Sequence, residues 1–200
     1  MAFFAVARIS GGLSASLALQ RFEEADAQLQ APADVDVGLW SAQRILEYKK
    51  SLTADPGLPL AVLRIPRLKL EVPVFDGTDE LTLNRGAGRI IGTARAGESG
   101  NVGIAGHRDG FFRGLKDIDR GDELELRIPG RTERYVVTAT LITTPDDVSV
   151  LRTTPTPTLT LVTCYPFYFA GSAPLRYIVH ASIRPADESG SAPVITARTP

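Results

Sequence analysis

Residues 158–183 read TLTLVTCYPFYFAGSAPLRYIVHASI, and this stretch decides the class of fold. Apolar and polar residues alternate over residues 158–163 and again over 176–183, which is the period-two pattern of a half-buried β-strand. The residues between them are rich in Pro, Gly and aromatic side chains, which favour an exposed loop. The stretch therefore predicts two adjacent strands that run in opposite directions, so that Arg176 returns toward Cys164.

Further short segments upstream carry the same signs of strand structure. They lie at residues 60–65, 68–74, 101–106, 123–128 and 135–143. Turns rich in Gly, Pro and Asp separate them, and no long helical pattern lies between them. Seven or eight short strands at this spacing predict an all-β sandwich or a closed barrel.

The amino-terminal part of the chain has a different character. Residues 13–30 and 39–52 favour helices, and the sequence Ala-Asp-Pro-Gly around Pro56 ends the second of them. We expect three parts. A helical segment with a linker covers residues 1–56, and a β domain covers residues 57–184. A disordered tail rich in Ala, Ser, Thr and Pro covers residues 185–200. Because the motifs described below lie after Pro56, we expect the preceding residues to be dispensable for activity.

The first 19 residues, MAFFAVARISGGLSASLAL, are apolar but contain Arg8 and several Gly and Ser residues. A membrane span needs about 20 predominantly apolar residues, and an arginine at its centre costs about 2.5–3.5 kcal/mol on insertion. The segment fits a weak membrane anchor, the remnant of a longer anchor, or an ordinary amphipathic helix. The sequence leaves these interpretations open.

The composition excludes several classes of function. The 200 residues carry a formal net charge of −1, and their basic residues form no continuous field of the kind that binds nucleic acid. A single cysteine, Cys164, cannot form an internal disulfide, and two histidines make a Cys/His zinc site improbable. We predict no cofactor, no metal ion and no nucleic-acid partner.

Cys164 is a candidate nucleophile because of where it lies. It ends an alternating strand and is followed by a loop rich in Pro and aromatic residues. Scaffolds present functional side chains at such strand ends, whereas most lone cysteines are small buried hydrophobic residues. Position alone leaves both interpretations open.

A cysteine nucleophile needs a partner that takes and returns a proton near neutral pH, and histidine is the usual choice. His107 ends a predicted strand and precedes polar residues, which suits this role or an ordinary loop position. Arg176 opens the strand after the Cys164 loop, where it could stabilise an oxyanion or be a solvated surface cation. His180 lies within that strand, and we interpret it as structural or solvent-facing.

At these residues the sequence resembles the sortase family. The segments that carry the resemblance are LNRG at residues 83–86, IAGH at 104–107, TPDDVSVL at 144–151, TLVTC at 160–164 and LRYIV at 175–179. TLVTC is similar to the TLxTC signature around the sortase cysteine, IAGH to the segment with the sortase histidine, and LRYIV to the strand that opens with the sortase arginine. The resemblance covers about residues 60–183 in the family's order.

The resemblance implies a closed eight-stranded β-barrel with Cys164, His107 and Arg176 at one end. It implies that Cys164 attacks a peptide carbonyl, that His107 is the acid and base, and that Arg176 holds the substrate and the oxyanion. Within the family the sequence is most similar to class D. The connection before the cysteine strand is too short for the extra helix of class B, and Gly57 stands where the class C lid has an aromatic residue.

The resemblance also implies partners and a location. It predicts a cysteine transpeptidase on the extracytoplasmic face of the cell membrane, which cleaves an LPxT-like sorting motif of secreted proteins. The acceptor is expected to be an amine from a cell-wall precursor or a pilin lysine. Two alternatives stay open: a non-catalytic barrel that binds an extended peptide by strand addition, and a cysteine peptidase that releases its product to water.

Calcium is not expected to be needed. Class A sortases that use calcium carry several acidic residues just before the histidine strand. Here residues 93–100 contain one acidic residue, Glu98, and one basic residue, Arg95. Calcium prefers about six to eight oxygen ligands, several of them carboxylates, so this stretch does not predict a calcium site.

Overall fold

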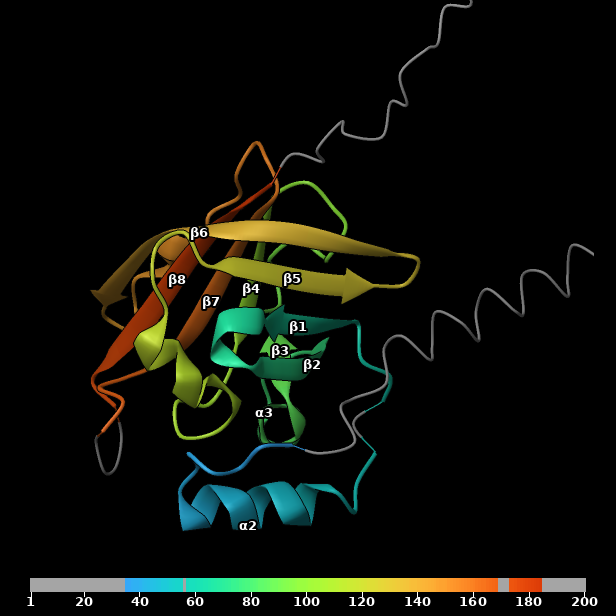
Figure 1. Ribbon diagram of the computed structural model, residues 1–200, viewed down its shortest axis with the longest axis vertical. Coiled ribbons are helices and arrows are strands. Elements are labelled where there is room, and N and C mark those ends of the chain that lie inside the picture. Colours follow the sequence, from blue (N-terminus) through green and yellow to red (C-terminus); the bar gives the residue numbers. More distant parts are fainter. Residues whose placement is uncertain (1–34, 56, 169–172, 185–200) are drawn as a thin grey trace, which may run out of the picture.

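The computed structural model describes residues 35–55, 57–168 and 173–184, and at its centre strands close into a barrel (Figure 1). The strands are β1 (Ala61–Ile65), β2 (Leu70–Asp76), β3 (Ala87–Arg89), β4 (Asn101–Ala105), β5 (Glu123–Ile128), β6 (Arg131–Thr143), β7 (Thr158–Tyr165) and β8 (Leu175–Ile183). Their order around the barrel is β1-β2-β3-β4-β7-β8-β6-β5. The predicted closed barrel of eight strands is confirmed.

Two of the strand pairs in this barrel are parallel, β2 with β3 and β4 with β7, and the others are antiparallel. In the β4–β7 pair, Ala105 lies beside Val162. Because the two strands run the same way, both end at the same end of the barrel. That end carries the residues that follow β4 and those that close β7.

The apolar side chains of the alternating strands fill the barrel. Leu63 on β1, Leu126 on β5, Leu161 on β7 and Val179 on β8 are each fully buried in one hydrophobic cluster. Burying a side chain of this size stabilises a fold by about 1.5–3 kcal/mol. The core therefore fixes the register of each strand, because a shift by one residue would turn these side chains outward.

Short helices connect the strands. They are α3 (Glu80–Arg85) and the 3₁₀ segments η1 (Pro66–Leu68), η2 (Phe111–Asp117) and η3 (Val148–Leu151). Asp79 begins α3: its carboxylate accepts hydrogen bonds from the backbone N–H and the hydroxyl of Thr82. These hydrogen bonds, the backbone one most of all, lower the pKa of Asp79.

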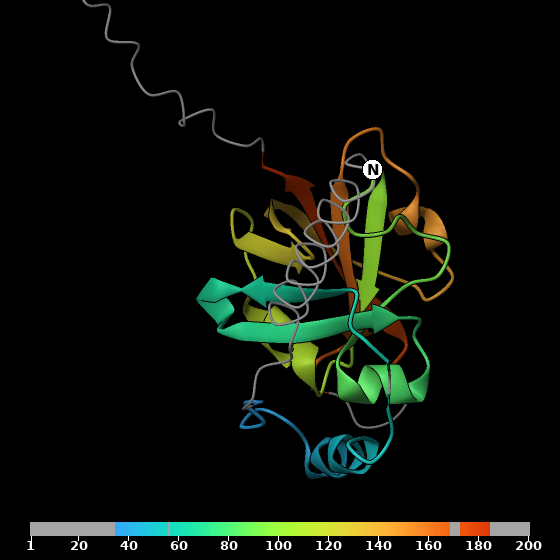
Figure 2. The same ribbon diagram turned by 90° about the vertical axis from the view of Figure 1, so that its right-hand side faces the viewer.

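Helix α2 (Ala42–Ser51) lies outside the barrel, beside α3 at one end of it (Figures 1 and 2). Ser41 caps its first turn by accepting a hydrogen bond from the backbone N–H of Arg44. Lys49 and Lys50 lie in the last turn, where positive charge is favourable. The helix predicted over residues 39–52 is therefore confirmed, with slightly shorter bounds.

Among the α-helices and strands, two were not predicted, α3 and β3. Strand β3 is three residues long, too short to show an alternating pattern. Its Gly88 runs so close to the turn after β2 that an added Cβ would lie 2.0 Å from the carbonyl oxygen of Gly77. Conversely, β6 begins at Arg131, earlier than the predicted residue 135.

Some predictions concern residues outside the described part of the chain. These are the helix over residues 13–30, the possible membrane anchor over residues 1–19 and the tail over residues 185–200. Within residues 35–55, 57–168 and 173–184, no helix has the length and apolar character to cross a membrane.

Candidate active site

Cys164 lies near the end of β7, between two strands that each bring a candidate partner to it. Strand β7 pairs with β4 on one side and with β8 on the other. The thiol is free and partly exposed. The position is thus accessible, unlike the buried position of most structural cysteines.

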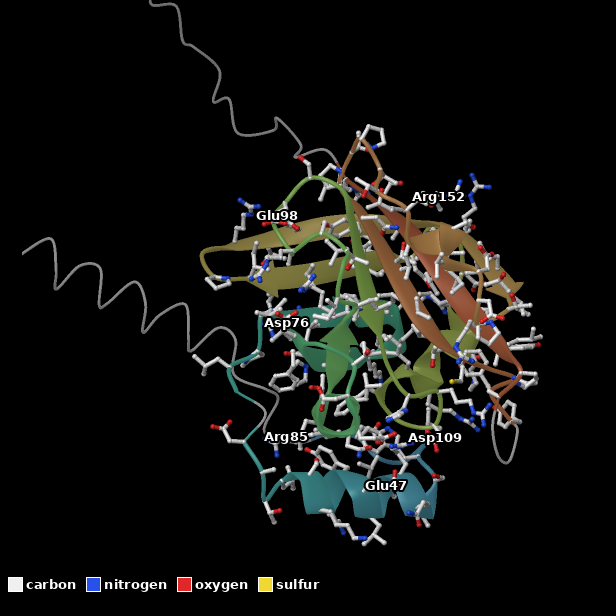
Figure 3. The ribbon with its side chains drawn as sticks, turned by 180° about the vertical axis from the view of Figure 1, so that it is seen from behind. Glu47, Asp76, Arg85, Glu98, Asp109 and Arg152 are labelled. Carbon is white, nitrogen blue, oxygen red and sulfur yellow. The ribbon has the colours of Figure 1, made fainter. Side chains whose placement is uncertain are left out.

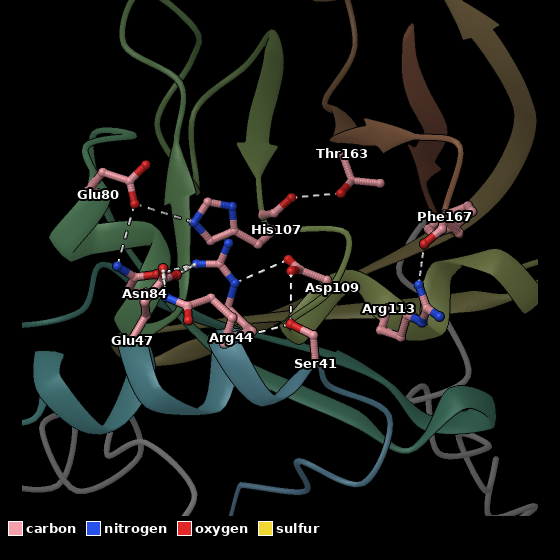
Figure 4. Close-up of polar contacts among 12 residues, drawn as sticks. Ser41, Arg44, Glu47, Glu80, Asn84, His107, Asp109, Arg113, Thr163 and Phe167 are labelled. Atoms are coloured by element: carbon pink, nitrogen blue, oxygen red, sulfur yellow. Dashed lines mark hydrogen bonds and ion pairs between the residues drawn. The ribbon is translucent and has the colours of Figure 1, made fainter. Parts of the chain in front are cut away.

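His107 follows β4 on the side of β7. The parallel register continues past β4, because Gly106 donates its backbone N–H to the carbonyl of Val162 at 3.1 Å. The buried Thr163 hydroxyl then donates to the carbonyl of Gly106 at 2.7 Å (Figure 4). His107 follows Gly106, and Cys164 follows Thr163. The same register therefore places His107 beside Cys164.

Arg176 is on the other side of the cysteine. In the antiparallel β7–β8 pair, Cys164 and Arg176 are direct register partners. The Nη1 atom of Arg176 donates to the carbonyls of Leu175 at 3.0 Å and Ala173 at 3.4 Å. The structure thus brings the three predicted residues together, with Cys164 on β7 between Arg176 on β8 and His107 just after the end of β4.

The imidazole of His107 is largely shielded from solvent. Its Nε2 atom is buried and has no hydrogen-bond partner among the described residues. The nearest acid is Glu80, with Oε2 at 3.9 Å, but the Glu80 side chain is 84% exposed and that of His107 is 18% exposed. Water therefore screens the attraction of Glu80 for an imidazolium.

Burial is the main cause that lowers the pKa of His107 below its ordinary value. The positive charge of Arg44 lowers it further, while Glu80, Asp109 and Glu47 oppose the shift. The net effect favours the neutral imidazole at neutral pH, a form that is able to accept a proton. The contact with Glu80 becomes an ion pair only when His107 is protonated.

A cavity of about 810 Å³ opens beside these residues, and Cys164, His107 and Arg176 all line it. A second group of lining residues comes from α2 and the turn before it: Leu39, Trp40, Ser41, Gln43 and Arg44. Figure 3 shows Glu47 of α2 and Asp109 at this end, whereas Arg152 and Glu98 lie at the other. Residues before Pro56 therefore form part of the site, and we expect them to matter for activity, contrary to the expectation from the motifs alone.

Two arginines near η2 form hydrogen bonds with the residues after β7, which make up one side of the cavity. Arg113 donates to the carbonyl of Phe167 (Figure 4) and lies over the ring of Tyr168, 4.2 Å from its centroid. Arg108 donates to the carbonyl of Pro166 at 3.1 Å. These contacts tie the chain beyond Cys164 to the segment that follows His107, so the two sides of the site are fixed relative to each other.

His180, on β8, does not line the cavity. Its Nδ1 atom lies 3.0 Å from the hydroxyl of Thr160, and that hydroxyl donates to Oδ1 of Asn101 at 2.7 Å. Because a hydroxyl has one hydrogen to donate, His180 is the donor to Thr160 and carries its proton on Nδ1. Burial lowers the pKa of His180. These contacts agree with a structural position.

No group of three or more His, Cys, Asp or Glu side chains suited to a metal ion occurs among the described residues. The acidic residues around η2 are instead engaged by Arg67. Its guanidinium binds the carboxylate of Asp122, lies 3.5 Å from Asp119 and donates to the carbonyl of Asp117. The independence from calcium stays a prediction.

The comparison with known proteins agrees with this fold and identifies the family. A profile of the sortase domain matches residues 63–184, which is more than half of the chain. The chain belongs to the sortase family, and it is therefore a cysteine transpeptidase. This assignment favours an enzyme over the non-catalytic binding module that the sequence left open.

Individual relatives give the same result. Sortase D of Bacillus subtilis is 31% identical over 162 residues, which cover 80% of this chain and 81% of that protein. The Clostridium perfringens Sortase D5 transpeptidase matches with a TM-score of 0.60 and 26% identity, over 84% of this chain and 99% of the other. Sortase E1 from Streptomyces coelicolor, solved with a tripeptide in the active site, has a TM-score of 0.58 and 28% identity, over 64% and 90%. The predicted similarity to class D is confirmed.

Proposed function

We propose that Cys164, His107 and Arg176 are the catalytic residues of this sortase. In this proposal Cys164 is the nucleophile, His107 the acid and base, and Arg176 the group that holds the substrate and the oxyanion. The observation that carries it is their arrangement beside one cavity, with Cys164 on β7, Arg176 opposite it on β8 and His107 just after β4.

The first half of the reaction forms a thioacyl enzyme. Cys164 gives its thiol proton to His107, its sulfur attacks the carbonyl carbon of the scissile peptide bond, and the carbonyl oxygen becomes an oxyanion. When the oxyanion collapses, the C–N bond breaks, and the leaving amine takes a proton from His107. The acyl part of the sorting peptide is then bound to Cys164 through a thioester.

The second half transfers the acyl group. An acceptor amine attacks the thioester carbon and gives a proton to His107. The C–S bond breaks, and the Cys164 sulfur takes the proton back from His107, which restores the thiol and the neutral imidazole. A water molecule in place of the amine would give a free acid instead, which is the reaction of a peptidase.

Arg176 suits the oxyanion for a geometric reason. A guanidinium carries five N–H donors in a planar fork. Its Nη1 atom donates to two carbonyls of its own loop, so the side chain is held in place before the substrate arrives. A donor that is fixed in advance stabilises developing charge better than one that must reorganise.

The family assignment suggests the substrate class, and we propose its finer details from the sequence resemblance. The donor is an LPxT-like sorting motif of a secreted protein, and the acceptor is an amine of a cell-wall precursor or a pilin lysine. We further propose that residues 57–184 form the catalytic domain and that it works on the extracytoplasmic face of the membrane. Residues 1–19 are the candidate anchor.

The test is a turnover assay with the parent enzyme and its Cys164→Ala variant. A peptide with an LPxT-like motif is incubated with and without an added amine, and mass spectrometry follows the transpeptidation product, the free acid and the thioacyl enzyme. We expect the joined product to dominate when amine is present, and Cys164→Ala to form neither product nor thioester. Turnover at the parent rate by a folded Cys164→Ala protein would refute the assignment, and free acid alone at saturating amine would favour a peptidase.

A further inference from the structure

Arg44 joins helix α2 to the barrel at the active site. Its side chain is 13% exposed, and its partners come from three parts of the chain. Its Nε atom donates to Oδ1 of Asp109 at 3.1 Å, and its Nη1 atom donates to Oδ1 of Asn84 on α3. The same Nη1 atom pairs with Glu47 of α2 at 2.8 Å. Figure 4 shows the guanidinium between these partners.

The turn that Arg44 contacts is the one that begins with His107. The carbonyl of His107 accepts hydrogen bonds from the backbone N–H groups of Gly110 and Phe112, at 3.1 and 3.2 Å. Asp109 lies within this turn, so a contact on its carboxylate bears on the position of the imidazole. The hydroxyl of Ser41, at the start of α2, donates to the other oxygen of Asp109 at 3.3 Å.

The stem of Arg44 also packs onto this turn. Its Cγ and Cδ atoms lie 3.4 Å from the place where a Cβ on Gly110 would be, and His107 Cβ lies 3.5 Å from the same point. The aliphatic part of the side chain therefore covers the backbone next to His107. A Cβ at position 110 would lie at van der Waals contact distance from both side chains.

Aromatic packing provides a second attachment of this segment. The ring of Trp40, just before α2, meets the ring of Phe111 edge-on with centroids 4.7 Å apart. Tyr48 of α2 meets both rings, at 5.5 Å from Trp40 and 6.0 Å from Phe111. Since Phe111 opens η2, the polar and the aromatic contacts of α2 both fall on the segment that follows His107.

We propose that Arg44 is a positioning residue of the active site, which docks α2 onto the His107 turn and so completes the wall of the substrate cavity. The inference rests on the proposed role of His107 as acid and base. Arg44 does not touch the reacting atoms in this proposal, because Asp109, Asn84 and Glu47 occupy its guanidinium.

The charges around His107 make the proposal measurable. Arg44 and Glu47 face it from α2, Glu80 from α3 and Asp109 from its own turn, and Cys164 and Arg176 line the same cavity. Arg44→Met removes a positive charge, leaves Asp109 and Glu47 without their cation and lets water reach the imidazole. Each of these changes favours the imidazolium, so the variant is expected to raise the pKa of His107.

The composition of the chain allows clean readouts in the full-length protein. It contains two histidines, so NMR titration of the imidazole protons gives the pKa of His107 with His180 as an internal reference. It contains one tryptophan, so the fluorescence emission of Trp40 reports whether the segment before α2 stays packed on Phe111. Neither measurement depends on turnover.

The experiment compares Arg44→Met with Arg44→Lys and with Arg64→Met. Arg64 also pairs with two carboxylates, Glu71 and Glu125, but it lies on β1 and does not line the cavity. We expect Arg44→Met to raise the pKa of His107 but not of His180, and to shift Trp40 emission to longer wavelength. We expect Arg44→Lys to give smaller shifts in the same direction, because lysine keeps the charge but not the planar fork.

Turnover gives a third readout. Misplacing catalytic groups by about 1 Å can cost about 10²-fold, so we expect kcat/KM of Arg44→Met to fall by up to about that factor, mainly through kcat. The limb of the pH–rate profile that follows His107 should move to higher pH. Arg64→Met should match the parent in all readouts.

The outcomes separate this proposal from the assignment of the catalytic residues. An unchanged His107 pKa or unchanged Trp40 emission in Arg44→Met would overturn the docking role, whatever the catalytic residues are. Parent-like turnover by His107→Ala would overturn the catalytic assignment and leave the NMR and fluorescence results standing.

Discussion

Cys164 and Arg176 lie directly opposite each other on β7 and β8. In an antiparallel pair, opposite residues have their side chains on the same face of the sheet. The backbone register therefore sets the relation between thiol and guanidinium before any side-chain contact is considered. The Arg176 side chain also donates to two carbonyls of its own loop. The strand register therefore fixes the backbone position of this cation beside the thiol, and these hydrogen bonds restrain its side chain.

Arg176→Lys is expected to be nearly as damaging as Arg176→Ala. Lysine offers one point charge, which cannot both hold the loop carbonyls of Ala173 and Leu175 and face an oxyanion. Loss of an oxyanion donor costs about 2.7–4 kcal/mol in other enzymes, or about 10²–10³-fold in kcat. Steady-state kinetics on folded variants measures this, and a harmless Arg176→Ala would show that the residue is wrongly assigned.

The two histidines are expected to differ sharply in turnover. His107→Ala removes the group proposed to carry the proton, and general acid–base catalysis supplies about 10²–10⁴-fold. His180→Ala leaves the hydroxyl of Thr160 bonded to Asn101, so its turnover should stay close to the parent value. The two rates are measured under the same conditions after a folding check. Equal losses in both variants would contradict the assignment.

Stability is expected to fall as the pH decreases below about 6.5. Burial lowers the pKa of both His107 and His180 in the folded protein. Between the lowered pKa and the ordinary value of 6.5, the unfolded chain binds more protons than the folded one, so acidification favours unfolding.

Urea unfolding at several pH values from 7.5 down to about 5 measures this effect. The unfolding free energy of the parent should decline over the range, and His180→Gln should reduce the slope. The carboxylates with a lowered pKa, such as Asp122, titrate at more acidic pH and do not contribute here. An equal slope in parent and variant would show that His180 is not the source.

Gly106→Ala is expected to destabilise the barrel next to the active site. An added Cβ would lie 2.7–3.0 Å from ring atoms of Phe112, a fully buried residue that has little room to move. Overpacking of this kind costs about 1–3 kcal/mol, and the displaced backbone would carry His107 with it. Gly114→Ala is the matched control, since its nearest neighbour lies 3.9 Å away. Thermal unfolding that does not distinguish the two would contradict this account.

Activity is expected not to need calcium. The acidic residues near η2 already have a cation, because Arg67 binds Asp122 through two nitrogens and keeps the pKa of that carboxylate low. Calcium would have to displace this guanidinium to reach its oxygen ligands. Turnover should be equal with millimolar calcium and with chelator. Saturable stimulation by calcium would direct attention to Asp117, Asp119, Asp122 and Glu123.

Parts of the fold could be predicted because they depend on local patterns. Strand β5 occupies the predicted residues 123–128, since its alternating residues face the core and water in turn. The neighbouring positions of Cys164 and Arg176 followed from two alternating strands joined by one loop. The three-residue β3 has no such pattern, and its close approach to Gly77, just after β2, depends on Gly88 rather than on any periodicity.

The rest of the site depends on contacts between distant segments. His107 comes beside Cys164 through a parallel pair of strands, and only the family resemblance indicated this in the sequence. Arg44 was missed because a charged residue on a short amphipathic helix is usually solvated. Its low exposure results from Asn84 and Asp109, which follow it by 40 and 65 positions in the chain. No local signal marks such a contact.

The parallel pairing of β4 with β7 also bears on how the enzyme acquires its activity. The hydrogen bond from Thr163 to Gly106 closes a loop of 57 positions, so it forms only after much of the chain has collapsed. Non-local pairings of this kind make folding slow. Under the proposed catalytic assignment, a newly made chain carries the Cys164 thiol without the His107 imidazole beside it until the barrel closes. Catalytic reactivity is then expected to appear as a late step of folding.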